Sequence, residues 1–474
     1  MIVGFALLHD FIYGEGMDFM QIVRGTAFQE EKTCKETGGS PGGQKGFGIA
    51  ADIGTTTIAM SLYNLGTGEE LGSAQEKNCQ TQMGADVMMR LMHCQQGRQK
   101  QLCEMIQKQL GEMARNLCHD VCRDEEMKRF VVVGNPTMCH IFLGMDARGL
   151  AGSPFQPAYT GAYCCSGSDV GMRFFGSMEV CVIAGVDAHV GADAVAMAAA
   201  LRLQDPGGTR IAVDVGTNAE IILSHQGRIV AGSAPAGPAF EGAGISQGMR
   251  GEPGAIAAFK IALHADNIIL DVIGMGHGIG EKKVKPCGIC GSGLVDAVAE
   301  LCRCGLIRAD GYLLSRQEAQ DARIPLFLCE RLTSDGFILY QPASDDCVVL
   351  TREDIRQFQL AKAAVQAGIR ILLQSQELGV EQMGQFYVAG VFGGHINVKS
   401  AIRIGLFPDM PAGKVHIVGN AAGDGAAQSL LSERFCRETE RIAAQAKHVE
   451  LALQKEFQSE FLGAMKLVSW RLEG

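Results

Sequence analysis

GIAADIGTTTIAMSLYN (48–64) and RIAVDVGTNAEIILSHQGRIV (210–230) share one plan: an apolar run, an Asp, an apolar residue, Gly, Thr, and a second apolar run. A glycine-centred break between two runs rich in β-formers predicts a strand–turn–strand hairpin. The second copy begins about 160 residues after the first. Two copies of this hairpin indicate an internal duplication, so we predict two related subdomains that face each other across a cleft.

The turn residues of both hairpins suit a phosphate ligand. A tight turn at Gly54 or Gly216 lets backbone N–H groups approach an anion closely. Asp52 and Asp214 end apolar runs, where a carboxylate can hold hydrated Mg²⁺ beside a polyphosphate. We expect both acids to be metal ligands and catalytic residues, although two ordinary turns are the alternative. The side chains expected to clasp the phosphates are Thr55, Thr56, Thr57, Thr217 and Asn218.

A third glycine-rich segment, AGVFGG (389–394), follows another apolar run. Gly390, Gly393 and Gly394 would let a flat nucleoside lie against bare backbone, although strand-to-helix turns often need glycine anyway. Lys362 precedes this segment on an expected helix and is a candidate to reach the nucleotide, with a solvated lysine as the alternative. Glu241, in a glycine-rich loop after the second hairpin, is a candidate to contact ribose or Mg²⁺.

Two acids, Asp187 and Asp193, follow the apolar run VCVIAGV (180–186). In-line attack on a γ-phosphate needs a group that orients water, and an acid suits that task. We therefore count both among the catalytic candidates, with helix capping as the competing explanation. We interpret His140 and His395 as structural.

Composition excludes several classes of protein. The 474 residues carry a net charge of −10, whereas general binding to DNA or RNA needs a basic surface. No segment reaches the ~20 apolar residues that span a bilayer. We therefore expect a cytoplasmic protein that binds neither nucleic acid nor membrane. The 17 cysteines are mostly scattered singly, which predicts reduced thiols.

Apolar runs alternate with helical patterns, which predicts an α/β architecture. Residues 100–118 have helical periodicity, and residues 351–374 open with a capping box at Thr351 and Asp354. Residues 25–46 are polar and end in clustered Gly, Ser and Pro, which predicts a flexible leader. We divide the chain into that leader (1–46), a first subdomain (47–200), and a second subdomain with insertions and C-terminal helices (201–474).

The ordered set of motifs resembles one family. The chain is similar to the ATP-dependent reductive activators of corrinoid proteins, within the superfamily of actin, heat-shock chaperones and sugar kinases. The resemblance runs from about residue 47 onward and rests on DIGTTT, NCQTQMGADVMMR (78–90), VVVGNPTMCH (131–140), VDVGTNAEI (213–221), PAGPAFEGAGISQGM (235–249), GICGSGLVD (288–296), AGVFGG and VGNAAGDGA (418–426).

The resemblance implies two duplicated actin-like, ribonuclease H-like subdomains with ATP between them. It also implies that ATP use drives a Co(II) corrinoid protein to the Co(I) state. A corrinoid protein or corrinoid-dependent methyltransferase is the expected partner, and a homodimer the expected assembly.

That family usually carries a ferredoxin-like domain with four cluster-binding cysteines, whereas residues 1–46 contain only Cys34. We therefore expect no iron–sulfur cluster within this chain. On this view the leader is a possible remnant of a lost domain, and a separate ferredoxin-like donor supplies the electrons.

Two alternatives use the same scaffold. A small-molecule kinase would need a catalytic carboxylate beside a substrate hydroxyl, a part that Asp187 could play. A non-catalytic, nucleotide-gated module would bind ATP and a corrinoid protein without releasing phosphate.

Overall fold

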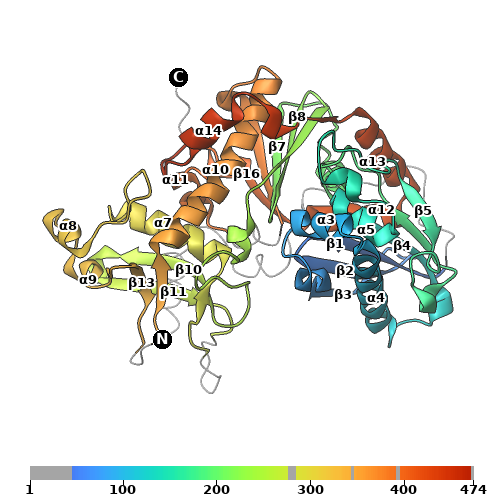
Figure 1. The fold of residues 1–474 in the computed structure, drawn as a ribbon, viewed down its shortest axis with the longest axis horizontal. Helices are drawn as coiled ribbons and strands as arrows, with labels where there is room; N and C mark the ends of the chain where they lie inside the picture. The colour runs from blue at the N-terminus through green and yellow to red at the C-terminus, as the bar shows by residue number, and fades with distance from the viewer. Residues whose placement is uncertain (1–44, 276–283, 343–345, 391–395, 471–474) are drawn as a thin grey trace.

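The computed structural model describes residues 45–275, 284–342, 346–390 and 396–470. Figure 1 places the elements of residues 47–200 at one end and α7–α9 with β10, β11 and β13 at the other. Strands β7, β8 and β16 and the long helix α10 lie between them. Among the described residues, no helix has the length and apolar character that a membrane crossing requires.

The first half is built on a six-stranded sheet of order β3-β2-β1-β4-β6-β5. Strand β1 pairs antiparallel with β2 and parallel with β4. The hairpin predicted from the first Asp-x-Gly-Thr motif is the β1–β2 pair. The strands are β1 Phe47–Ile53, β2 Thr57–Asn64, β3 Glu70–Lys77, β4 Met127–Gly134, β5 Tyr163–Ser166 and β6 Glu179–Val182.

The second sheet has the order β16-β15-β7-β8-β9-β17 and repeats the first plan. Its hairpin, β7–β8, is antiparallel, and β7 pairs parallel with β15 as β1 does with β4. This repetition confirms the α/β fold of two duplicated subdomains. The strands are β7 Thr209–Val215, β8 Ala219–His225, β9 Arg228–Ala234, β15 Met383–Ala389, β16 Val415–Gly419 and β17 Lys447–His448.

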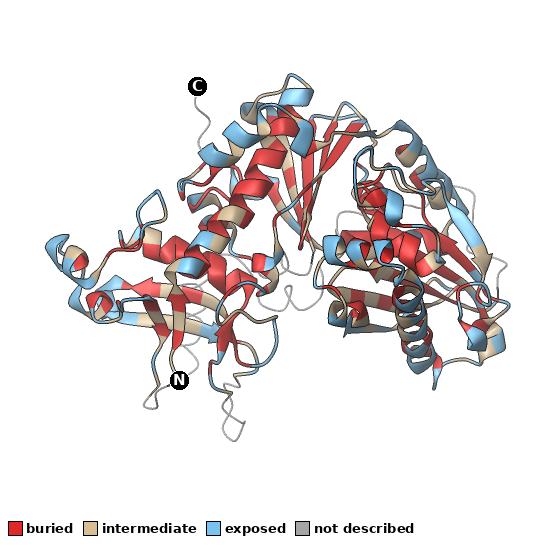
Figure 2. Cartoon of the chain, viewed as in Figure 1, coloured by how far each residue is buried: buried red, intermediate tan, exposed pale blue. Residues whose placement is uncertain are grey.

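Both helices predicted in detail are present. Helix α4 spans Gln99–Cys118, and α10 spans Arg352–Ser375 with the predicted capping box between Thr351 and Asp354. The central strands and the inner face of α10 are buried (Figure 2). The other helices are α3 Val87–Gln95, α5 Pro136–Leu143, α6 Ala192–Ala200, α7 Gly291–Arg303, α8 Arg316–Asp321, α9 Leu326–Cys329, α11 Val398–Arg403, α12 Ala421–Leu431, α13 Glu433–Gln445 and α14 Phe457–Ala464.

Between the second hairpin and α10, the chain forms two smaller sheets. One has the order β11-β10-β12, with α7 packed on β10, and the other is the β13–β14 hairpin. Both smaller sheets lie between β9 and α10 in the sequence. The strands are β10 Ala255–Ala262, β11 Asn267–Val272, β12 Gly288–Ile289, β13 Gly336–Tyr340 and β14 Val348–Thr351.

Helix α12 lies in sequence between β16 and β17 of the second sheet but packs on the first. It contacts β1, β4 and α6, and its Ala422 and Ala426 are buried in the core that β1 and β4 share. The backbones of α12 and α6 approach closely, because a Cβ on Gly425 would lie 2.3 Å from the Ala196 carbonyl oxygen. The first sheet is therefore covered by a helix from the C-terminal part of the chain.

The prediction of reduced thiols fails at one pair. Cys164 of β5 and Cys181 of β6 form a disulfide. They are direct partners in the antiparallel register of these strands, which places their Cβ atoms side by side. A separation of 17 residues gave no sign of this pairing in the sequence.

Candidate active site

The turns of the two hairpins meet. Thr56 Oγ1 lies 3.5 Å from Thr217 Oγ1, although 161 residues separate them. Arg250 adds a second link, because its Nη2 donates to the Thr56 carbonyl oxygen at 3.1 Å. The predicted pair of facing turns is thus present, with hydroxyl groups from both turns at the junction.

Besides Arg250, three side chains hold the first turn. Asn78 Nδ2 donates to the Gly54 carbonyl oxygen at 2.9 Å, and the Arg90 guanidinium donates to the Thr55 carbonyl oxygen. Asn135 Nδ2 donates to Thr55 Oγ1 at 3.0 Å. Since this hydroxyl oxygen already accepts a hydrogen bond, its own proton is available to an acceptor such as a phosphate oxygen.

Arg90 is completely buried. Its side chain also donates to the Gly84 carbonyl oxygen and to Gln80 Oε1, each at 3.1 Å. Burial lowers the pKa of the guanidinium to about 10, which still leaves it charged at neutral pH. This buried cation therefore holds the Thr55 carbonyl group of the first turn in place.

The second turn is held by an acid. Thr217 Oγ1 donates to Glu241 Oε1 at 2.9 Å, and the Gly216 N–H donates to the Asn218 carbonyl oxygen at 3.1 Å. Glu241, predicted as a direct contact to ribose or Mg²⁺, therefore has a partner within the protein. Its position lets it orient the Thr217 hydroxyl.

Four carboxyl groups gather at the two hairpins. Asp52 lies on β1 and Asp214 on β7, while Glu220 lies directly across from Asp214 on β8. Asp193 is in the first turn of α6 and accepts from the Ala194 N–H at 2.8 Å. Each of the four keeps part of its surface open to solvent.

The pKa values of these carboxyl groups are all raised. Burial, followed by the charges of Asp193 and Asp214, raises the pKa of Asp52 to about 8. Burial, Asp193 and Glu241 raise that of Asp214 to about 7. Burial raises the pKa of Asp193 to about 6 and that of Glu220 well above its ordinary value. Within the described parts of the chain, no positively charged side chain lowers these pKa values, which is the pattern expected of a site that takes up a cation.

Hard oxygen ligands of this kind fit Mg²⁺. Asp52 and Asp214 come from equivalent positions of the two hairpins, and their mutual repulsion raises the pKa of Asp52. A divalent cation between the hairpins would remove that repulsion. The donor set thus suits the metal that the sequence predicts, with Asp193 and Glu220 as further carboxylates nearby.

Gly390 lies against this cluster. Its φ is +90°, and a Cβ at this position would lie 2.5 Å from Asp214 Oδ1. The glycine is therefore required by the approach of β15 to the aspartate, whatever it contributes to a nucleoside. Gly393, Gly394 and His395 lie outside the described residues.

Lys362 does not reach toward the hairpins. Its ammonium is buried and donates to the carbonyl oxygens of Ala464 and Lys466, both at 2.6 Å. Burial, with repulsion from Arg370, lowers its pKa to about 7. The expected nucleotide contact is corrected accordingly: periodicity placed Lys362 on a helix, but the C-terminal segment covers its side chain.

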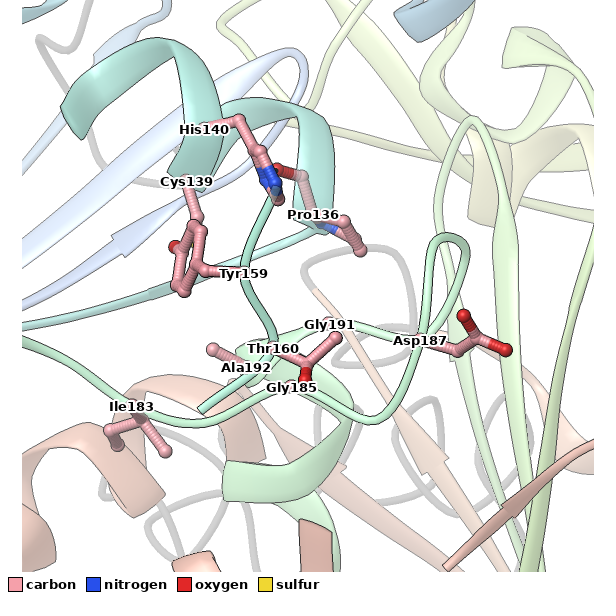
Figure 3. A pocket seen from close by; sticks show the side chains of 10 residues that line it. All are labelled: Pro136, Cys139, His140, Tyr159, Thr160, Ile183, Gly185, Asp187, Gly191 and Ala192. Carbon is pink, nitrogen blue, oxygen red and sulfur yellow. Dashed lines mark hydrogen bonds between the residues drawn. The ribbon is translucent and has the colours of Figure 1, made fainter. Parts of the chain in front are cut away.

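Asp187 has a partner outside the carboxylate cluster. Its Oδ2 accepts from His448 Nδ1 at 3.0 Å, and its Oδ1 accepts from the Ala188 N–H at 2.8 Å. Figure 3 shows its carboxylate pointing away from the other labelled side chains. This placement separates Asp187 from Asp193, with which the sequence had grouped it.

A cavity of about 20 Å³ lies beside Gly191, along the loop that carries Asp187 (Figure 3). That volume accommodates one water molecule. His140 lines it and has a structural role as predicted, since its Nδ1 donates to the Pro136 carbonyl oxygen at 2.7 Å. The remaining lining residues are Pro136, Cys139, Tyr159, Thr160, Ile183, Gly185, Asp187 and Ala192.

Two family models together match nearly all of the described chain. Residues 47–206 match the RACo middle region, and residues 208–473 match the C-terminal domain of RACo, the ASKHA domain. The chain belongs to the RACo family. Its fold is accordingly the ASKHA fold of actin, sugar kinases and heat-shock chaperones, as the duplicated sheets indicate.

Two individual proteins are also similar to this chain over most of its length. The chain is 32% identical to the corrinoid activation enzyme RamQ of Eubacterium limosum, over 88% of this chain and 69% of that protein. It is 26% identical to the [Co(II) methylated amine-specific corrinoid protein] reductase of Methanosarcina barkeri, over 88% of this chain and 76% of that protein.

The solved structure of a reductive activator for corrinoid, iron–sulfur protein matches this chain with a TM-score of 0.79 and 31% identity. The match covers 90% of this chain and 67% of that one. The resemblance to reductive activators of corrinoid proteins, predicted from the motifs, is confirmed.

Sequence reasoning missed the residues that support the RACo hairpins. Asn78 and Arg90 stand at the two ends of NCQTQMGADVMMR, a motif whose sequence alone indicates no role for either residue. Asn420, in VGNAAGDGA, caps α12 by accepting from the Gly423 N–H at 2.8 Å and also hydrogen-bonds the Asp52 carboxyl. The motifs were the available signal, but the contacts join segments far apart in sequence.

Proposed function

We propose that this chain binds ATP with Mg²⁺ between its two hairpins and uses it to drive a Co(II) corrinoid protein to the Co(I) state. The partner would be a corrinoid protein or a corrinoid-dependent methyltransferase, and a separate ferredoxin-like protein would donate the electrons. The names of the two curated relatives, a corrinoid activation enzyme and a corrinoid-protein reductase, support this assignment.

The carboxylate cluster between facing hydroxyl-bearing turns carries the proposal. Asp52 and Asp214 would hold Mg²⁺, which would neutralise charge on the phosphate oxygens. The Thr55 hydroxyl oxygen accepts a hydrogen bond from Asn135 Nδ2, so its proton would be donated to a phosphate oxygen. Thr56, Thr57, Gly54, Gly216, Thr217 and Asn218 complete the proposed phosphate site, and Gly390, Gly393 and Gly394 the proposed adenosine site.

Hydrolysis requires a positioned water molecule. Asp193 is the acid that we assign to this task, because it belongs to the carboxylate cluster and adjoins the water-sized cavity through Gly191 and Ala192. Glu241 would act through the Thr217 hydroxyl, from which it accepts a hydrogen bond. Asp187 and Lys362 are not in the proposed site, because each is bonded elsewhere.

ATP would serve as the source of a conformational change rather than of a phosphoryl group. The two turns belong to different sheets and touch through Thr56 and Thr217, so a ligand held by both would favour one mutual arrangement. Reduction of Co(II) is uphill for ordinary cellular donors. A change of shape that binds one cobalt environment more tightly than another can supply the difference.

The test is anaerobic phosphate release from ATP with and without a Co(II) corrinoid protein encoded nearby. We expect stimulation by the corrinoid protein, and loss of turnover by roughly 100-fold or more in Asp214→Ala with the fold retained. Asp120→Asn, at a side chain that is 92% exposed, is the control.

Unchanged turnover in Asp214→Ala would refute the site. Turnover that no corrinoid protein affects would favour a small-molecule kinase, which a screen of hydroxyl and carboxyl acceptors would identify. ATP binding without phosphate release would instead favour a nucleotide-gated binding module.

A further inference from the structure

Two histidines and two acids form a cluster away from the proposed nucleotide site. Asp187 and His189 lie in the loop between β6 and α6, whereas His448 ends β17 and Glu450 follows it. Strand β6 belongs to the first sheet, and β17 pairs with β9 of the second. The cluster therefore joins segments 261 residues apart, from the two halves of the chain.

Each histidine has a carboxylate partner across this junction. His448 Nδ1 lies 3.0 Å from Asp187 Oδ2, and His189 Nδ1 lies 2.8 Å from Glu450 Oε2. The imidazole rings of His189 and His448 are 5.9 Å apart and nearly perpendicular. The side chains of His448, Glu450 and His189 are 10%, 22% and 31% exposed, so the cluster is half-buried yet accessible to an ion.

The other ring nitrogen of His448, Nε2, faces the Glu450 carboxylate. Because a carboxylate only accepts, His448 Nδ1 must carry the proton that it shares with Asp187. In the neutral ring, Nε2 then presents a lone pair, and it stands 4.0 Å from Glu450 Oε2. Two acceptors facing each other at this distance repel unless a cation lies between them.

The spacing of the atoms suits a metal ion. One ligand atom each from His189, His448 and Glu450 lies within 4.8 Å of the others. Ligands bonded at 2.0–2.1 Å to a tetrahedral zinc lie about 3.3 Å apart. Glu450 Oε2 lies 2.8 Å from His189 Nδ1 and 4.0 Å from His448 Nε2, and these separations bracket that value. Metal binding would release to solvent the proton that His189 Nδ1 shares with Glu450, and small side-chain movements would then bring all three atoms to one ion.

We propose that His189, His448 and Glu450 bind a divalent transition metal ion of the zinc type. Asp187 supports the site by fixing the ring of His448, the usual second partner of a metal-bound imidazole. Imidazole and carboxylate together suit zinc better than Mg²⁺, which prefers oxygen ligands alone. The ion would clamp the β6–α6 loop to β17 and so tie the two halves of the chain together.

Zinc uptake in solution tests the site. The full chain, freed of metal by a chelator and kept in excess Mg²⁺, is dialysed against zinc, and bound zinc is counted. We expect His448→Gln and His189→Gln each to bind one equivalent less than the unchanged chain. His119→Gln is the matched control. His119 Nδ1 also lies 2.8 Å from an aspartate oxygen, that of Asp120, but among the described residues His119 belongs to no group of three possible metal ligands.

Thiols also bind zinc, so the difference between variants, and not total uptake, decides the result. Equal uptake in all three variants and the unchanged chain would overturn the proposal. If a variant fails to fold, crystals of the unchanged chain grown with zinc decide by anomalous diffraction. A peak bonded to His448 Nε2 and Glu450 supports the site, and peaks only at other positions overturn it.

Discussion

The two hairpins share a motif but differ in what holds their turns. The first turn is held by donors: Asn78 and Arg90 bind its carbonyl oxygens and Asn135 binds a hydroxyl. The second is held by Glu241, which accepts a hydrogen bond from the Thr217 hydroxyl, and by the Gly237 N–H, which donates to the Thr217 carbonyl oxygen at 2.9 Å. We infer that the first turn is the fixed side of the cleft and the second the adjustable side.

The duplication keeps the strand residues of the two hairpins equivalent but not the residues that support their turns. The strand ends Asp52 and Asp214 occupy equivalent places because the sheet topology repeats. The supports beneath the turns come from elements that the two halves do not share, such as η1 (Cys79–Gln82) and α3 near the first turn and η5 (Pro238–Glu241) near the second. Substitutions at these supports should therefore separate the two turns.

Removal of Arg90 should have the largest effect. Arg90→Met leaves buried acceptors at Gln80, Gly84 and Thr55 without a donor, so we expect a loss of about 3 kcal/mol or more in unfolding free energy. Urea unfolding measures this change. Arg356→Met, on the exposed side of α10, is the control.

In the same variant, the Michaelis constant for ATP should rise, because the first turn loses its support. A stable Arg90→Met protein with unchanged ATP kinetics would contradict the inference that the first turn is fixed and the second adjustable.

Lys362→Met should have the next largest effect and should spare the hairpins. The variant leaves the Ala464 and Lys466 carbonyl groups unpaired, at a cost of about 2 kcal/mol. The sole tryptophan, Trp470, lies in the same segment and reports its release by fluorescence. ATP turnover should stay unchanged, and a large loss of turnover would return Lys362 to the nucleotide site.

The same lysine makes a prediction about pH. Its pKa is about 7 in the folded chain and 10.5 ordinarily, so the unfolded chain binds the extra proton between these values. Stability therefore rises with pH from 7 to 10.5 for the unchanged chain relative to Lys362→Met. Urea midpoints of both proteins across this range measure the trend, and a flat or falling difference would contradict it.

Glu241→Ala should have the smallest effect. It frees the Thr217 hydroxyl at the cost of one hydrogen bond of about 1 kcal/mol, so ATP turnover should fall roughly fivefold with little change in stability. Steady-state phosphate release measures it, with Glu252→Ala, at an exposed side chain, as control. A loss as large as that of Asp214→Ala would mean that Glu241 contacts the ligand directly.

The sequence predicted what is local or repeated. The two hairpins, α4 and the capping box of α10 each depend on residues within one segment, and the duplicated sheets follow from the repeated hairpin. The contacts of Arg90 with Thr55 and of Asn420 with Asp52 join distant segments, so only the folded chain shows them. Lys362 was misplaced because periodicity gives the face of a helix but not what packs against it.

Helix α12 has a consequence for synthesis on the ribosome. The first sheet is complete in sequence at Val182, but the helix that covers it begins at Ala421, about 240 residues later. At ~5–20 residues per second, the ribosome needs roughly 10 to 50 seconds to reach it. During that interval the apolar face that α12 covers in the folded chain is open, and it stays so until Ala421–Leu431 emerge from the ribosome.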